Sequence, residues 1–145
     1  MPRQHFAAIR DAVVGAVSSR PDILAAYVFG SVATGQTRKD SDVDVAILLR
    51  NGIRPSRAFR LRLELMSDVG HALRRRDIEV VILNDASPLF AHRVLSNGKL
   101  VFERSASARV RFQVMTANRY ADQVPAYEIH IRYLKKSVRE GRIIG

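Results

Sequence analysis

The sequence predicts a mixed fold of strands and helices around one core, α/β in the sense of α+β. Three short apolar stretches, at 23–29, 42–49 and 77–83, have the length of strands and end at Gly or at polar residues. Other apolar residues recur at helical spacing. With 145 residues, 47% of them hydrophobic, the chain is long enough to bury a single core.

The first half of the chain predicts a helix followed by two strands. Helical spacing runs over 4–18 and stops before Pro21. It is carried by the apolar residues Phe6, Ile9, Val13 and Val17. The strand at 23–29 is stopped by Gly30, and the connection 30–41 leads to the strand at 42–49.

A second helix is expected after Pro55, with Ser56 as its N-cap. Its buried stripe is expected to be Phe59, Leu63, Met66, Val69 and Leu73. The strand at 77–83 follows.

Pro88 opens a short helix through Leu95, and Asn97-Gly98 turns into a strand at 100–102. A last helix is indicated by the spacing of Val110, Val114, Ala117 and Ala121. Pro125 is expected to end or kink it, and Tyr127, Ile131, Leu134 and Val138 continue the helical spacing beyond.

The most informative motif is Gly30-Ser31, ten further residues, and then Asp42-Val43-Asp44. It places a flexible corner and a hydroxyl one strand away from two carboxylates, which share one face of the second strand. Two acids on an otherwise apolar strand are costly to bury unless a cation neutralises them. Oxygen ligands without nearby Cys suit Mg²⁺ or Mn²⁺. The pattern therefore predicts a metal-nucleotide site.

Two simpler interpretations remain for the parts of this motif. Asp-x-Asp alone is often a solvated strand end, and Gly-Ser alone is often a turn. The segment from Gly30 to Thr37 nearly matches a P-loop, but Gln36 stands where the Lys is needed and a strand follows instead of a long helix. We reject the P-loop. In the third strand, Asp77 and Glu79 also share one face.

Gly-Ser-x10-Asp-x-Asp resembles the signature of the polymerase-beta-type nucleotidyltransferases. FGSVATGQTRKDSDVDVAILL is similar to their smallest members, the minimal nucleotidyltransferases or MNT domains, and so is DIEVVILNDASPLFAHRVLSNGKLVFER. The resemblance covers roughly residues 10 to 105. It implies a palm-like fold with a mixed, mostly antiparallel sheet of about four strands flanked by helices. Residues 1–105 would form the catalytic domain, and 106–145 a C-terminal helical extension packed on it.

The resemblance also implies roles for the site residues. Backbone amides around Gly30 and Ser31 would bind the phosphates of ATP, and Asp42 and Asp44 would bind Mg²⁺. Glu79 takes the position of the third carboxylate, where the family has Asp, and would be a catalytic and metal-binding residue with them. Asp77 is the alternative third acid. Arg38 and Lys39 face phosphate or solvent equally well, and Asp40 is expected to be a turn residue.

MNT proteins commonly act as antitoxins of HEPN-family RNase toxins, modifying a toxin tyrosine with AMP from ATP. The resemblance therefore implies a protein adenylyltransferase whose partner is a HEPN toxin. Two alternatives stay open: an MNT-fold antitoxin that only binds its toxin, and a small-molecule adenylyltransferase acting on an aminoglycoside. A net charge of +10 disfavours a pocket for a polycationic drug.

Composition excludes several other classes of protein. There are no cysteines, hence no disulfides or thiolate zinc sites, and this fits the cytoplasm. No apolar run reaches the ~18 residues of a membrane span, and the N-terminus lacks a signal-peptide core. The four histidines show no ligand spacing. The +10 charge would also suit nucleic acid, but few aromatic residues accompany it, so nucleic-acid binding is not favoured.

Overall fold

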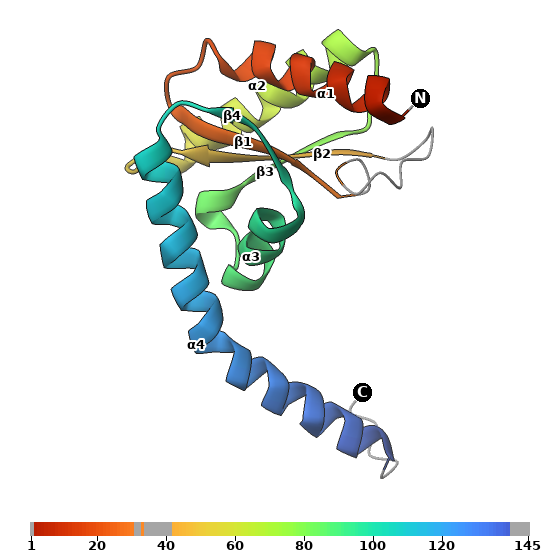
Figure 1. Cartoon of the computed structure of the whole chain (residues 1–145), viewed down its shortest axis with the longest axis vertical. Helices are drawn as coiled ribbons and strands as arrows, with labels where there is room; N and C mark the ends of the chain where they lie inside the picture. Colours follow the sequence, from red (N-terminus) through yellow and green to blue (C-terminus); the bar gives the residue numbers. More distant parts are fainter. Residues whose placement is uncertain (1, 31–32, 34–41, 140–145) are drawn as a thin grey trace.

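A computed structural model of the chain describes residues 2–30, 33 and 42–139, and its centre is a four-stranded sheet (Figure 1). The strands are β1 (Ile23–Phe29), β2 (Val43–Leu49), β3 (Ile78–Ile82) and β4 (Lys99–Glu103). Their order is β3-β2-β1-β4. The strand β1 pairs antiparallel with both β2 and β4, whereas β3 runs parallel to β2. The predicted mixed, mostly antiparallel sheet flanked by helices is confirmed.

Helices cover both faces of this sheet. The helices α1 (Pro2–Val17) and α2 (Pro55–Leu73) lie together on one face, above the sheet in Figure 1. The short η1 (Leu83–Asp85), α3 (Pro88–Asn97) and the long α4 (Ala106–Arg139) lie on the other side. Within the part of the chain that the structure describes, no helix combines the length and apolarity needed to cross a bilayer.

The alternation of β2 divides the core into two. Val43, Val45 and Ile47 are buried in the larger cluster, with residues of α1 and α2. Ala46 and Leu48 point the opposite way, into a smaller cluster with residues of η1 and α3. Asp44 is in phase with Ala46 and Leu48, so its carboxylate belongs to the face that α1 and α2 leave free.

The start of α2 corrects the predicted cap. Arg54 is the N-cap residue, with extended backbone and no hydrogen bond from its side chain, and Pro55 opens the helix. Ser56 lies inside the first turn. Proline explains the difference, because its fixed φ and missing N–H suit the first helical position and move the start of the helix ahead of Ser56.

The predicted buried stripe of α2 is also wrong in part. Phe59 and Leu63 are 56% and 47% exposed. The residues of α2 that the structure buries are Ala58, Leu61, Leu65, Val69 and Gly70. The helix carries apolar residues on more than one face, so two stripes fit its spacing, and packing against α1 and β3 selects one of them.

Two leucines of α2 test this face directly. Leu65→Ala should destabilise the fold by about 2–5 kcal/mol, because Leu65 is 1% exposed and its loss leaves a cavity. Leu63→Ala, the matched control on the same helix, should change the free energy of unfolding by only about 0.5 kcal/mol. Urea unfolding of both variants measures the difference, and equal losses would contradict the observed packing.

The helix α4 continues through Pro125 and is not ended by it. Figure 1 shows that its course bends partway along. A proline in a helix interior removes one backbone hydrogen bond and clashes with the preceding turn, which accounts for a bend in this region. Near its start the helix contacts α3 and β1, and Phe112 packs against the smaller core cluster.

Candidate active site

Gly30 and Asp44 meet where β1 ends and β2 begins. Phe29 and Asp44 are partners in the antiparallel register, so the residue after Phe29 faces the Asp44 side chain. Gly30 has φ +75°, and a Cβ atom built on it would lie 2.3 Å from Asp44 Oδ2. The left-handed backbone favours glycine, and a Cβ at this position would also force the Asp44 carboxylate to shift. The predicted Ser31, like Arg38, Lys39 and Asp40, lies outside the described residues.

Gly30→Ala should consequently lower the free energy of unfolding by more than the backbone strain alone. Gly52 is a matched control, because its φ is +85° and no atom lies within 4 Å of a Cβ built on it. Gly52→Ala should destabilise the fold by about 1–2 kcal/mol, the cost of an L residue in this conformation. Gly30→Ala should exceed that loss, since Asp44 must also move. Thermal unfolding compares the two, and equal losses would mean that the Asp44 contact is unimportant.

The parallel pairing of β2 and β3 brings a third acid beside Asp44. Asp44 and Glu79 are partners in this register, so their side chains stand next to each other on the same face of the sheet. Asp42 is exposed, directly before β2 and two residues from Asp44. Asp42, Asp44 and Glu79 therefore lie along one end of the β2–β3 pair.

The charges of these acids act on one another. Burial, followed by the negative charges of Asp42 and Glu79, raises the pKa of Asp44 above its ordinary value. Burial and like charge both disfavour the ionised carboxylate, and a nearby cation would favour it. Asp42 and Asp44 thus fit a hard divalent cation by chemistry and by electrostatics. Across the described residues, however, no three His, Cys, Asp or Glu side chains already form a metal-binding group.

Glu79 is held by an arginine from α2. Arg62 Nη2 donates to Glu79 Oε1 at 2.7 Å, and Arg62 Nε donates to the backbone oxygen of Val80 at 2.8 Å. The second bond satisfies an acceptor on β3, which is an edge strand. Arg62 therefore ties the Glu79 carboxylate to the outer edge of the sheet in this structure.

Asp77 is engaged by an arginine from the loop just before β3. Both of its carboxylate oxygens accept hydrogen bonds from Arg75, at 2.8 Å from Nε to Oδ1 and through Nη2 to Oδ2. These bonds lower the pKa of Asp77 below its ordinary value. Its backbone oxygen accepts from Val43 N at 2.9 Å, which holds the strand entry. Asp77 thus has the contacts of a structural residue.

Sequence reasoning missed Arg62 altogether. Its contact with Glu79 joins two residues 17 positions apart, one on a helix and one on a strand. No local sequence pattern predicts such a contact. The contact between Arg75 and Asp77 could have been predicted from the sequence, because Arg75 stands two residues before Asp77 in the run Arg74-Arg75-Arg76.

The raised pKa of Asp44 predicts that Asp44→Asn makes the protein more stable. Because the pKa is higher in the folded than in the unfolded chain, the ionised carboxylate destabilises the fold at neutral pH. The gain should be at most about 1 kcal/mol, or a few degrees in Tm, since the site is partly open to solvent. It should shrink as the pH falls through the raised pKa toward 3.8. Thermal unfolding from pH 7 to pH 4 checks this, and a destabilised variant at pH 7 would contradict it.

The chain matches a known protein family. Residues 13–107 match the family model described as polymerase beta, nucleotidyltransferase. Among curated proteins, none matches the chain.

The chain is also similar to solved structures. One is a toxin-antitoxin structure with AMP-PNP, 23% identical with a TM-score of 0.73, covering 87% of this chain and 98% of that one. Another is the tri-AMPylated Shewanella oneidensis HEPN toxin in complex with MNT antitoxin, at 20% identity and a TM-score of 0.68, with 93% and 99% covered. A third is the toxin-antitoxin MntA-HepT, which is 21% identical with a TM-score of 0.67, covering 88% of this chain and 97% of that one. At these identities the likeness shows a common fold.

Proposed function

This chain belongs to the polymerase beta nucleotidyltransferase family, and we propose that it transfers AMP from ATP to a tyrosine hydroxyl of a cognate HEPN-family RNase toxin, thereby acting as the antitoxin. The observation that carries the proposal is the corner at which Gly30 makes room for Asp44, whose pKa is raised by burial and then by the charges of Asp42 and Glu79. Two similar structures add support, one with AMP-PNP and one with a tri-AMPylated HEPN toxin. We place the pair in the cytoplasm, where ATP is available.

The residues of the corner have separate tasks in this proposal. Asp42 and Asp44 would hold the metal ion, Mg²⁺ or Mn²⁺, which when bound supplies positive charge between these carboxylates and the triphosphate. Gly30, together with Ser31, would let the phosphates approach the backbone closely. We assign 1–105 to this chemistry and 106–145 to a helical extension packed on the same domain.

Glu79 would serve the acceptor side. The tyrosine oxygen forms a bond to the α-phosphorus, the bond from that phosphorus to the oxygen bridging to the β-phosphorus breaks, and pyrophosphate leaves. The Glu79 carboxylate would help to hold the metal ion on the acceptor side and would accept the tyrosine proton as the general base. For this, Glu79 must release Arg62, with which it forms an ion pair in the structure. The pair is half exposed and therefore weak enough to open.

The test is a transfer assay with a cognate HEPN-family toxin. ATP labelled at the α-phosphate should leave its label on the toxin, and ATP labelled at the γ-phosphate should not. Label from the γ-position would indicate a kinase. A toxin silenced without any label would favour the binding-only antitoxin, and label on an aminoglycoside instead would favour the small-molecule enzyme.

A further inference from the structure

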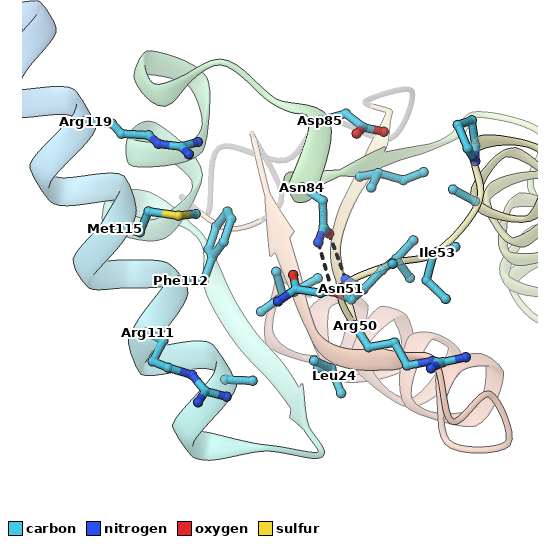
Figure 2. Close-up of a pocket in the computed structure, with 17 residues that line it drawn as sticks. Leu24, Arg50, Asn51, Ile53, Asn84, Asp85, Arg111, Phe112, Met115 and Arg119 are labelled. Atoms are coloured by element: carbon cyan, nitrogen blue, oxygen red, sulfur yellow. Dashed lines mark hydrogen bonds between the residues drawn. The ribbon is translucent and has the colours of Figure 1, made fainter.

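A large cleft lies at the opposite end of the sheet from the acids. It measures about 750 Å³ and lies between the end of β2 with the loop after it, η1, and α4 (Figure 2). Asp44 is near the start of β2 and Leu49 is its last residue, so the two sites are about 17 Å apart along the strand. The cleft is therefore separate from the proposed catalytic corner.

Two hydrogen bonds hold one wall of the cleft in place. Asn84 Oδ1 accepts from Leu49 N at 2.8 Å, and Asn84 Nδ2 donates to Leu49 O at 2.9 Å. These two bonds fix η1 to the end of β2. Leu24 and Leu48 contribute apolar surface from the sheet, and Phe112 contributes it from α4. The fold thus holds the shape of the cleft, and the floor of the cleft is apolar.

The α4 wall combines apolar and cationic side chains. Arg111, Met115 and Arg119 recur every four residues and line the cleft as one stripe. In Figure 2, Met115 and Phe112 point into the cleft, with Arg111 on one side of them and Arg119 on the other. Within the described part of the chain, neither Arg111 nor Arg119 has a hydrogen bond or ion pair.

The acids on the opposite wall do not neutralise the positive charge of Arg111 and Arg119. Arg50 binds Asp22, but Asp22 also binds Arg57, so one carboxylate serves two arginines. Asp85 is the one acid among the described residues that line the cleft. The cleft therefore carries net positive charge around an apolar centre.

We propose that this cleft binds an acidic segment of a protein partner, with an aliphatic side chain on the apolar floor and carboxylates at Arg111 and Arg119. The two arginines are eight residues apart on the helix, about 12 Å, a span that suits two acidic residues on either side of an aliphatic anchor. Protein is favoured over RNA, because the floor is mainly aliphatic and Phe112 is the one aromatic residue lining it in the described chain. The inference stands without the transfer reaction and without ATP.

The experiment is an unbiased selection from a phage library of random 12-residue peptides on the immobilised full chain. Selected peptides are then synthesised, and their affinities are measured by fluorescence anisotropy without ATP. The test variant is Arg111→Glu with Arg119→Glu. The matched control is Arg132→Glu with Lys135→Glu, two exposed residues of the same helix outside the cleft. Met115→Gln tests the apolar part of the α4 wall without changing charge.

We expect the selected peptides to place Asp or Glu on both sides of Leu, Ile or Val. Arg111→Glu with Arg119→Glu should weaken their binding by about tenfold or more, Met115→Gln should weaken it less, and the control should change it less than about twofold. A library without acidic enrichment, or equal losses in the test and control variants, would overturn the proposal. Displacement of the peptide by oligouridine RNA at lower concentration than by free peptide would assign the cleft to RNA instead.

Discussion

Asp44→Asn should lower the rate of AMP transfer by about a thousandfold or more while the protein remains folded. Asparagine keeps the shape of the side chain but removes the negative charge that a divalent cation requires, and such a loss removes several kcal/mol of transition-state stabilisation. Asp42→Asn should act in the same direction. Asp11→Asn is the control, because Asp11 is an exposed acid on α1, outside the site and outside the pockets of the described chain. Single-turnover transfer with saturating toxin measures the effect.

Binding of ATP gives an independent check on the same residues. Calorimetry should show that the wild-type chain binds ATP only with Mg²⁺ or Mn²⁺ present, and that the Asp42→Asn, Asp44→Asn double variant loses this dependence. Equal ATP affinity in the wild type and the double variant would remove the metal site from the account. The same experiment at pH 5 should show weaker binding, because the raised pKa of Asp44 lets protons compete with the metal at higher pH than usual.

Glu79→Gln should lower the transfer rate by about a hundredfold while leaving ATP affinity nearly unchanged, since the carboxylate is proposed to act on the acceptor hydroxyl. Loss of the Arg62 ion pair does not explain such an effect, because an exposed pair contributes only about 0–1 kcal/mol to stability. Glu79→Asp, the residue usual in the family, should keep substantial activity.

Asp77→Asn is the matched control, at the residue just before β3 and two positions from Glu79. It should have a mild effect on the rate, because Asp77 is bound by Arg75 and holds the strand entry. An inactive Asp77→Asn beside an active Glu79→Gln would make Asp77 the third carboxylate. If neither substitution lowers the transfer rate, catalysis depends on Asp42 and Asp44 alone.

Much of the fold could be predicted because its strands are short, apolar and well separated. The strand at 23–29 coincides with β1, and 42–49 differs from β2 by one residue. The helix at 4–18 is shifted by two residues at its start and one at its end. The spacing of Gly30 and the two aspartates predicted that they lie near each other, and the register of β1 with β2 accounts for the contact of Gly30 with Asp44. Their metal-binding and catalytic roles stay predictions.

What could not be predicted depends on packing between distant elements. The spacing of α2 allowed two apolar stripes, and contacts with α1 and β3 buried Leu65 where Leu63 was expected. The Arg62–Glu79 pair and the cleft beside α4 join residues far apart in the sequence. Neither follows from periodicity or from a motif.

The most direct test of the central claim is the intact mass of the HEPN toxin after incubation with this chain, ATP and Mg²⁺. The account predicts that the toxin gains the mass of one or more AMP groups and loses its RNase activity. With the Asp42→Asn, Asp44→Asn double variant, the toxin should keep both its mass and its activity. A toxin that is silenced at unchanged mass, and equally well by the double variant, would contradict transfer and show that binding alone neutralises it.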